Sequence, residues 1–382
     1  MSWEKVKLGD ISANIQTGPF GSQLHQSDYS EEGTPVVMPK DLVAGHISEA
    51  SIARVSDDHV SRLSRHKIQV GDILYSRRGD VGRCAFATEY EKGWLCGTGC
   101  LRVTIDTEKA VPKFAFYQLQ KAETIGWVEK HAVGSTMLNL NTSILSNVPV
   151  ELPPIAEQKR IVEILSAFDA LIENNQKQIK LLEEAAQRLY KEWFVDLRFP
   201  GYENAPIVDG VPEGWTHAVV TDLLDIKYGK DHKSLPDGDI PVYGSGGIMR
   251  KVNKILHSGE SVLIPRKGSL NNILLVSGDF WTIDTMFYSI PKQENIAKYV
   301  YLFLSGVDMY AMNIGAAVPS MTVKILDGMK LLYPKAEILA LFENMVGPYF
   351  SMIDLLRKQI GLLSEARDML LPKLMNGEIE VC

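Results

Sequence analysis

The sequence is poor in cysteine and has no long hydrophobic run. Its four cysteines among 382 residues form no second Cys/His pair at zinc-like spacing, so we expect buried, reduced thiols and no metal site. No apolar stretch approaches the roughly 20 residues that a membrane helix needs. The opening MSWEKVKLGD lacks the apolar core and cleavage site of a signal peptide. We therefore expect a soluble protein of the cytoplasm.

The signature motifs of common catalytic sites are also missing. Residues 244–247 read GSGG, but neither an Asn-Pro-Pro tetrapeptide nor an acidic ribose-binding strand accompanies them, as an adenine methyltransferase would require. The sequence has no G-x-x-x-x-G-K-[ST] phosphate loop, no G-x-S-x-G elbow and no H-E-x-x-H pair. These absences favour a binding protein over an enzyme, and we expect no cofactor of its own.

A net charge of −7 gives no general footprint for nonspecific nucleic-acid binding. Local basic loops that face a phosphate backbone are still compatible with this charge.

What the sequence does contain is a duplication. KQIKLLEEA at 177–185 recurs as KQIGLLSEA at 358–366, and residues 132–190 match 313–371 without a gap. Weaker echoes lie upstream, such as PKFAFYQL at 112 with AKYVYLFL at 297. Residues 112–130 and 296–313, which contain these segments, are expected to form helices. We expect an α+β fold with two duplicated mixed α/β domains and two long helices. The expected domain limits are 1–152, 153–199 (first helix), 200–334 and 335–382 (second helix).

Both helical segments carry apolar residues at alternating steps of four and three, which is a heptad seam. The first seam comprises Ile161, Leu165, Phe168, Ile172, Asn175, Ile179, Leu182, Ala186, Leu189 and Trp193. The second comprises Phe342, Val346, Tyr349, Ile353, Leu356, Ile360, Leu363, Arg367, Leu370 and Leu374. The simplest arrangement is an antiparallel coiled coil of the two helices. In the alternative, each helix only covers its own domain.

Single residues refine this interpretation. Asn175 either fixes the register of the seam or faces water, and Arg367 is expected to extend its charged end to solvent. Pro372 and Gly377 are expected to stop the second helix.

Glycine-containing basic turns recur at equivalent places in the two halves. RRGDVG at 77–82 follows an expected strand at 71–76, and RKGSLNN at 266–272 follows another at 260–265. Arg, Lys and Asn can contact base edges or phosphates, and glycine lets the backbone approach closely. Any one of these residues is more often an ordinary surface residue. As a set, they predict a DNA-binding face comprising Thr17, Ser22, Lys40, Arg77, Arg78, Arg83, Ser135, Asn139, Asn141, Lys227, Tyr228, Lys230, Lys233, Tyr243, Ser245, Arg266, Lys267, Asn271 and Asn272.

Residues 134–185, GSTMLNLNTSILSNVPVELPPIAEQKRIVEILSAFDALIENNQKQIKLLEEA, resemble the central region of the specificity subunit of Type I restriction-modification enzymes. The resemblance implies a non-catalytic subunit whose two recognition domains each read one half of a split DNA target. It also implies two methyltransferase subunits that modify adenine at N6 and a motor-endonuclease subunit. S-adenosylmethionine, ATP and Mg belong to those partners.

A helix of about 33 residues measures roughly 50 Å, which can hold two readers more than one DNA turn of about 34–36 Å apart. The second copy departs from the pattern, because GSTMLNLN becomes GAAVPSMT. Whether both junctions make the same contacts is open at this stage. The competing hypotheses are a protein-interaction scaffold and a stand-alone methyltransferase or nuclease.

Overall fold

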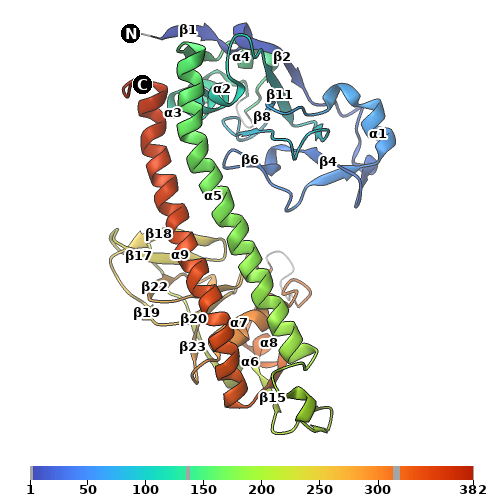
Figure 1. Ribbon diagram of the computed structural model, residues 1–382, viewed down its shortest axis with the longest axis vertical. Helices are drawn as coiled ribbons and strands as arrows, with labels where there is room; N and C mark the ends of the chain where they lie inside the picture. The colour runs from blue at the N-terminus through green and yellow to red at the C-terminus, as the bar shows by residue number, and fades with distance from the viewer. Residues whose placement is uncertain (1–2, 135–137, 313–318, 382) are drawn as a thin grey trace. The chain divides into compact units, whose positions relative to one another are not determined.

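The computed structural model describes residues 3–134, 138–312 and 319–381, and the chain divides into two compact units. One unit contains Met1–Glu173 with Ile360–Cys382, and the other contains Asn174–Gln359. Each unit therefore takes part of both long helices, α5 (Ile155–Tyr190) and α9 (Ala336–Met375). Figure 1 shows the course of the chain. No helix in the described ranges is long and apolar enough to cross a membrane.

Each unit contains two four-stranded sheets, and one of them has the same order and directions in both units. In the first unit, one sheet has the order β2-β11-β8-β9, and its strands are Ser12–Thr17, Cys100–Ile105, Ile73–Ser76 and Cys84–Phe86. In the second unit, the order β16-β23-β20-β21 repeats it with Leu224–Tyr228, Met286–Pro291, Ser261–Pro265 and Leu274–Val276. All neighbours in both sheets are antiparallel. The shared topology confirms the duplication.

The second sheet of each unit contains one parallel pair. Its order is β10-β4-β7-β3 in the first unit, with Leu95–Cys96, Thr34–Val37, Ala53–Val55 and Tyr29–Ser30. Its order is β18-β17-β22-β19 in the second unit, with Gly247–Val252, Ile240–Gly244, Asp279–Thr282 and His257–Ser258. The pairs β10–β4 and β17–β22 are the parallel ones.

Short strands and helices complete each unit. The first has β1 (Glu4–Lys7) with β12 (Pro149–Leu152), β5 (Leu42–Val43) with β6 (His46–Ile47), α1 (Asp57–Arg62), α2 (Pro112–Leu119), α3 (Ala122–His131) and α4 (Thr142–Ser146). The second has β15 (Thr216–Val219) with β24 (Lys330–Tyr333), β13 (Ile207–Val208) with β14 (Val211–Pro212), α6 (Val220–Leu223), α7 (Ala297–Ser305) and α8 (Val323–Asp327).

Within each unit, the segments of α5 and α9 lie side by side and run in opposite directions (Figure 1). In the first unit, Arg367 on α9 donates to Asp169 Oδ1 on α5 at 3.1 Å. In the second unit, Arg357 on α9 pairs with Glu183 at 2.9 Å. As the α5 number rises, the α9 number falls, which is the antiparallel order. Arg367 is thus held by an interhelical ion pair and does not simply extend to solvent as the sequence suggested.

The helix pair also completes the core of each domain. Ile161 and Leu165 at the start of α5 are buried in the same cluster as Leu374 and Met375 at the end of α9, together with Phe114 of α2. Both arrangements considered for the seam are therefore present, because the two helices pair with each other and each also covers its own domain.

In the second unit, the start of α9 meets the π-helical turn Lys191–Val195 that directly follows α5. The ring centroids of Phe194 and Phe342 are 4.8 Å apart, and that of Tyr299 on α7 lies 4.7 Å from Phe194. Edge-on aromatic contacts of this kind add to the free energy gained by burying the rings.

Three local expectations need correction. Pro372 does not stop the second helix, because α9 continues to Met375 and Gly377, with φ +69°, follows its end. The bond that Pro372 cannot donate falls at exposed Asp368, where water can take it. The helix expected at 112–130 is two helices, α2 and α3. The helix expected at 296–313 ends at Ser305, and residue 313 lies outside the described ranges.

Asn175 is buried, with 7% of its surface exposed, and its Nδ2 donates to Gln359 Oε1 at 3.3 Å. The water-facing alternative is therefore wrong, and the register-fixing alternative remains. Cys84, Cys96 and Cys100 are buried and unpaired, and burial raises the pKa of the Cys84 and Cys96 thiols to about 12.

We predict that Asn175→Leu stabilises the protein. Leucine would extend the apolar seam, and Gln359 is exposed, so water can replace its lost partner. A gain of about 1 kcal/mol would raise the melting temperature of a unit of this size by about 2–4 °C. Thermal unfolding followed by circular dichroism measures this shift. The control Gln176→Leu, at an exposed neighbouring position, should leave the melting temperature unchanged, and equal effects of both variants would contradict the seam assignment.

Candidate nucleic-acid interface

In the second unit, the ends of two strands bring predicted residues together. β16 ends at Tyr228 and β20 ends just before Arg266. The Arg266 guanidinium lies 5.3 Å from the centre of the Tyr228 ring, and the backbone N–H of Arg266 donates to the Thr285 carbonyl at 2.8 Å. The N–H of Lys230 donates to the neighbouring Thr282 carbonyl at 2.8 Å. The aromatic ring orients the guanidinium and leaves it half-buried.

The turn that follows β20 also lies close to three further predicted residues, Tyr243, Ser245 and Asn272. Asn272 Nδ2 donates to the Ser245 carbonyl at 2.8 Å, and the carbonyl of Tyr243 accepts from Ile283 N–H at 3.0 Å. A Cβ on Gly268 would lie 2.8 Å from Ser245 Oγ, and this glycine has φ +85°. Only glycine fits this turn without strain, so the close approach of the basic turn to Ser245 depends on it.

The first unit repeats this construction with different side chains. The N–H of Arg77 donates to the Gly99 carbonyl at 2.9 Å, as that of Arg266 does to Thr285. Thr17 ends β2, and the next residue, Gly18, donates its N–H to the Cys100 carbonyl at 2.9 Å. A Cβ on Gly18 would lie 1.8 Å from the Gly97 carbonyl oxygen. A Cβ on the equivalent Gly229 would lie 2.0 Å from the carbonyl oxygen of Ile283. Both turns thus need glycine for the same close approach.

The two junctions make the same backbone contacts. The N–H of Leu140 donates to the Arg77 carbonyl at 2.8 Å, and that of Met321 donates to the Arg266 carbonyl at 2.9 Å. The backbones of Arg78 and Asn139 form an isolated antiparallel β-bridge, and those of Lys267 and Ser320 form another. The sequence difference between GSTMLNLN and GAAVPSMT therefore leaves the described backbone of the junction in place. Ser135 and residues 315–318 lie outside the described ranges.

Asn141 has a structural role that the sequence did not predict. It is the N-cap of α4, and its Oδ1 accepts from Ile144 N–H at 2.8 Å. Thr322 caps α8 in the same way, with Oγ1 3.3 Å from Ile325 N. A cap satisfies backbone donors that the first helical turn leaves open. Asn139 differs, because its buried Oδ1 has no hydrogen-bond partner in the described part of the chain.

Other predicted residues have contacts outside these junctions. Arg83 pairs with Asp80 at 2.7 Å, Lys40 donates to the Ser51 carbonyl at 2.6 Å, and Asn271 Oδ1 accepts from Met309 N–H at 2.8 Å. Lys227 pairs with Asp225 at 2.8 Å, and the hydrogen bond to that carboxylate raises the pKa of the lysine. Ser22 and Lys233 are exposed. DNA contact by any of these side chains stays a prediction.

Sequence reasoning missed the loops that support the basic turns, residues 97–99 and 282–285. Each loop supplies a carbonyl that accepts from the first basic residue of the turn. A signal for the first was present in the run Gly97-Thr98-Gly99, since paired glycines mark a backbone that another segment approaches.

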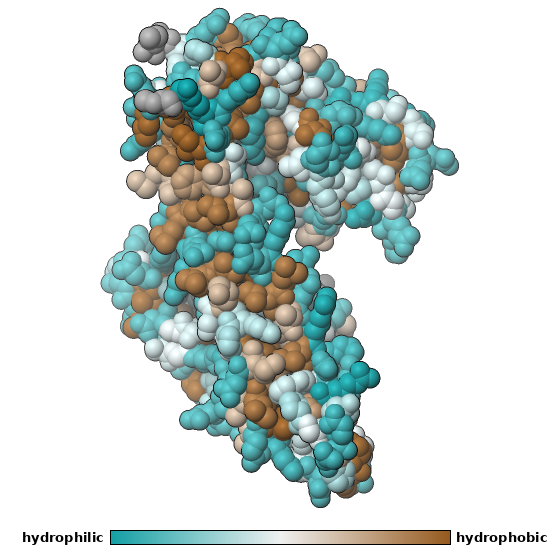
Figure 2. All heavy atoms as spheres, viewed as in Figure 1, coloured by the Kyte–Doolittle hydropathy of each residue, from teal (hydrophilic) through white to brown (hydrophobic). Residues whose placement is uncertain are grey.

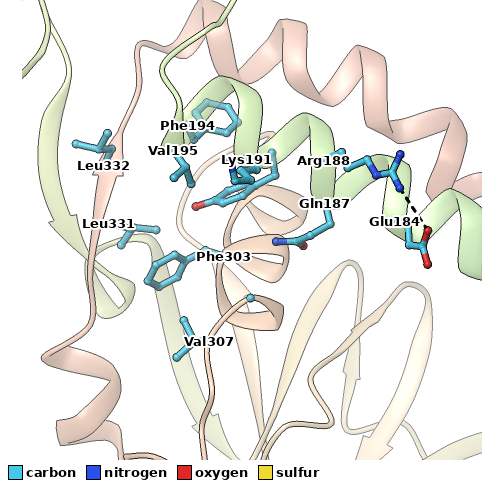
Figure 3. A pocket seen from close by; sticks show the side chains of 12 residues that line it. Glu184, Gln187, Arg188, Lys191, Phe194, Val195, Phe303, Val307, Leu331 and Leu332 are labelled. Carbon is cyan, nitrogen blue, oxygen red and sulfur yellow. Dashed lines mark ion pairs between the residues drawn. The ribbon is translucent and has the colours of Figure 1, made fainter. Parts of the chain in front are cut away.

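A separate groove of about 760 Å³ lies in the second unit beside the end of α5 (Figure 3). Phe303, Leu331 and Leu332 form an apolar side, and Arg188, which pairs with Glu184 at 3.8 Å, lies at the rim. None of the predicted DNA-contacting residues that the structure describes lines this groove. It is therefore a different surface from the candidate nucleic-acid interface.

Comparisons with known proteins agree on one family. The sequence model of the Type I restriction modification DNA specificity domain matches residues 1–184 and 212–341. The Type I restriction enzyme MjaIX specificity subunit of Methanocaldococcus jannaschii is 26% identical over 99% of this chain and 94% of its own length. The HindI specificity subunit of Haemophilus influenzae is 22% identical over 99% of both proteins.

A solved structure shows the same fold. The S subunit of a Type-I restriction-modification system from M. genitalium superposes with a TM-score of 0.60 at 20% identity, covering 97% of this chain and 96% of that one. Because the family's sequence model covers most of the chain, and relatives match it along nearly their whole length, this chain belongs to the family of Type I restriction-modification DNA specificity subunits.

Proposed function

We propose that the chain recognises a split DNA target, with each unit's mixed α/β domain reading one half-site. The observation that carries this proposal is the repeated construction of the basic turn. Arg77 in one unit and Arg266 in the other follow equivalent strands and are held by equivalent backbone bonds. The side chains around the turns differ between the units, so the two half-sites should differ in sequence. A scaffold without sequence-specific DNA binding is not favoured for a member of this family.

The chain itself performs no catalysis in this proposal. Methyltransferase subunits transfer a methyl group to adenine N6, and motor-endonuclease subunits cleave DNA. S-adenosylmethionine, ATP and Mg are bound by those partners. The complex acts on DNA in the cytoplasm.

An exposed apolar row on each long helix supports docking of these partners. We call it the outer stripe, comprising Ile164, Leu171 and Leu181 on α5 and Leu341, Met345, Met352, Leu355, Leu362 and Met369 on α9. Each side chain is more than a third exposed, and brown residues mark the helices on the face shown in Figure 2. Intervals that combine steps of three, four and seven are typical of a face that packs on another helix.

The outer stripe also supports the binding of two copies of the same partner. Ile164, Leu171 and Leu181 are the repeat equivalents of Met345, Met352 and Leu362, so three positions of the row recur on both helices. The other three residues of the row on α9 have polar or charged equivalents on α5. Two rows that share three positions fit two copies of one partner, each contributing an apolar helix. We assign them to the two methyltransferase subunits.

We predict that Arg266→Ala weakens binding to one half-site only. Loss of one base contact costs about 1–3 kcal/mol, or roughly five- to 150-fold in Kd. Fluorescence anisotropy of the assembled complex, at fixed salt, would compare the intact target with DNA in which one half-site is scrambled. Arg198→Ala, at an exposed position after α5, is the control. Equal Kd values for the two variants would contradict the assignment. A salt slope that falls by about one would identify a phosphate contact.

We predict that Leu181→Lys with Leu362→Lys prevents the methyltransferase subunits from co-purifying. Burial of a leucine contributes about 1.5–3 kcal/mol, and a buried unpaired lysine opposes association further. Because both positions are exposed in the chain itself, its melting temperature should not change. The control is Gln176→Lys, which lies off the outer stripe. Retained stoichiometry in the double variant would contradict the docking proposal.

We predict that shortening both helices shortens the DNA spacer. Residues 174–180 of α5 and 355–361 of α9 are repeat equivalents and contain the paired Asn175 and Gln359. Removing both heptads shortens the helix pair by about 10 Å, which corresponds to about three base pairs. Sequencing of methylated adenines should show unchanged half-sites at a shorter separation. An unchanged spacer would contradict the role of the helices as a ruler.

A further inference from the structure

In each unit, an equivalent and largely buried lysine on a short helix ties the mixed α/β domain to a long helix. Lys113 is the second residue of α2, and Lys298 is the second residue of α7. Alignment of PKFAFYQL with AKYVYLFL makes them repeat equivalents. Their side chains are only 19% and 12% exposed, which is unusual for lysine.

In the second unit, Lys298 bridges two carboxylates. Its Nζ lies 2.6 Å from Glu260 Oε1, next to β20, and 2.6 Å from Glu343 Oε1 on α9. Glu343 Oε2 is buried and has no hydrogen-bond partner within the described ranges. Burial lowers the pKa of Lys298, but the hydrogen bonds to the two carboxylates outweigh it and the pKa is raised. The ammonium is therefore charged and compensates two acidic groups from different elements.

In the first unit, Asp169 on α5 is the common partner. Lys113 Nζ lies 3.6 Å from Asp169 Oδ2, which also accepts from the Tyr117 hydroxyl at 2.6 Å. The Phe86 ring of β9 covers the ammonium, with 4.6 Å from Nζ to its centroid. Arg367 binds the other carboxylate oxygen, so Asp169 connects α2, α5 and α9.

The two arrangements, which we call the lysine clasps, are Lys113 with Asp169, and Lys298 with Glu260 and Glu343. Their lysines are equivalent, but their carboxylates are not, because the repeat partner of Asp169 is Phe350 and that of Glu343 is Val162. The two copies have thus reached the same connection with carboxylates at different helical positions. Both copies therefore hold the same connection, although the carboxylates that complete it lie at different helical positions.

Each lysine clasp also touches the strands that lead to a basic turn. Glu260 immediately precedes β20, which ends one residue before Arg266. Phe86 lies on β9, which pairs with β8, and β8 ends one residue before Arg77. A rigid connection at this place fixes the turn relative to the long helix of the same unit.

We propose that Lys113 and Lys298 are positioning residues that fix each recognition domain on the helix pair and so make the complex selective for one spacer length. This inference rests on the proposed function. The lysines do not contact DNA in this account. They act through the orientation of the basic turns.

The test uses the assembled complex and DNA that carries both half-sites with the native spacer or with one base pair more or fewer. Lys298→Met should lower the preference for the native spacer about tenfold, the change expected from loss of charge-assisted hydrogen bonds. Half-site specificity should not change. Lys298→Arg, which can keep both ion pairs, should retain the preference, and Lys330→Met, at an exposed position on β24, is the control.

A purely structural role predicts a different result, namely a lower melting temperature and an equal loss of binding on all spacers. That outcome would overturn the inference. If Lys298→Met does not fold, the triple variant Lys298→Met, Glu260→Gln and Glu343→Gln removes the stranded charges and leaves the domain without its clasp. An unchanged spacer preference in this variant would also overturn it. A wild-type complex with no spacer preference would refute the proposed function, and the inference with it.

Discussion

The antiparallel contact between α5 and α9 is the constraint on which both units depend. Neither domain closes its core alone, because each uses side chains from the start of one long helix and the end of the other. Ile161 and Leu165 meet Leu374 in the first unit, whereas Trp193 and Phe194 meet Phe342 in the second. Separation of the helices would therefore expose apolar surface in both cores. The folding of each domain and the pairing of the two helices therefore depend on each other.

The duplication explains why the architecture can serve a split target. Each unit holds a basic turn by the same backbone bonds, so the position of the turn does not depend on the side chains that project from it. Arg77 and Arg266 sit on the same backbone support, but among the described residues only Arg266 of the two lies against an aromatic ring, that of Tyr228. In this proposal, the backbone provides placement and the side chains provide sequence preference. The lysine clasps also contribute to placement, since they connect the strand before each turn to a long helix.

Much of this organisation could be predicted from the sequence because it is periodic or repeated. The heptad seam, the antiparallel pairing and the duplicated domains follow from the spacing of apolar residues and from the 313–371 repeat. What could not be predicted depends on contacts between distant segments. Lys113 gave no signal of its link to Asp169, and Asn141 was a DNA candidate although it caps α4. Asparagine suits both roles, and only the hydrogen bond that it accepts from the Ile144 N–H in the folded chain shows the capping role.

The central claim is that one chain reads two separate half-sites at a fixed distance. Sequencing of methylated adenines, in a cell that carries this chain with its methyltransferase subunits, tests it most directly. The account predicts one two-part motif whose halves differ in sequence and are separated by a spacer of constant length and arbitrary sequence. A single uninterrupted motif, or methylation without sequence preference, would contradict it.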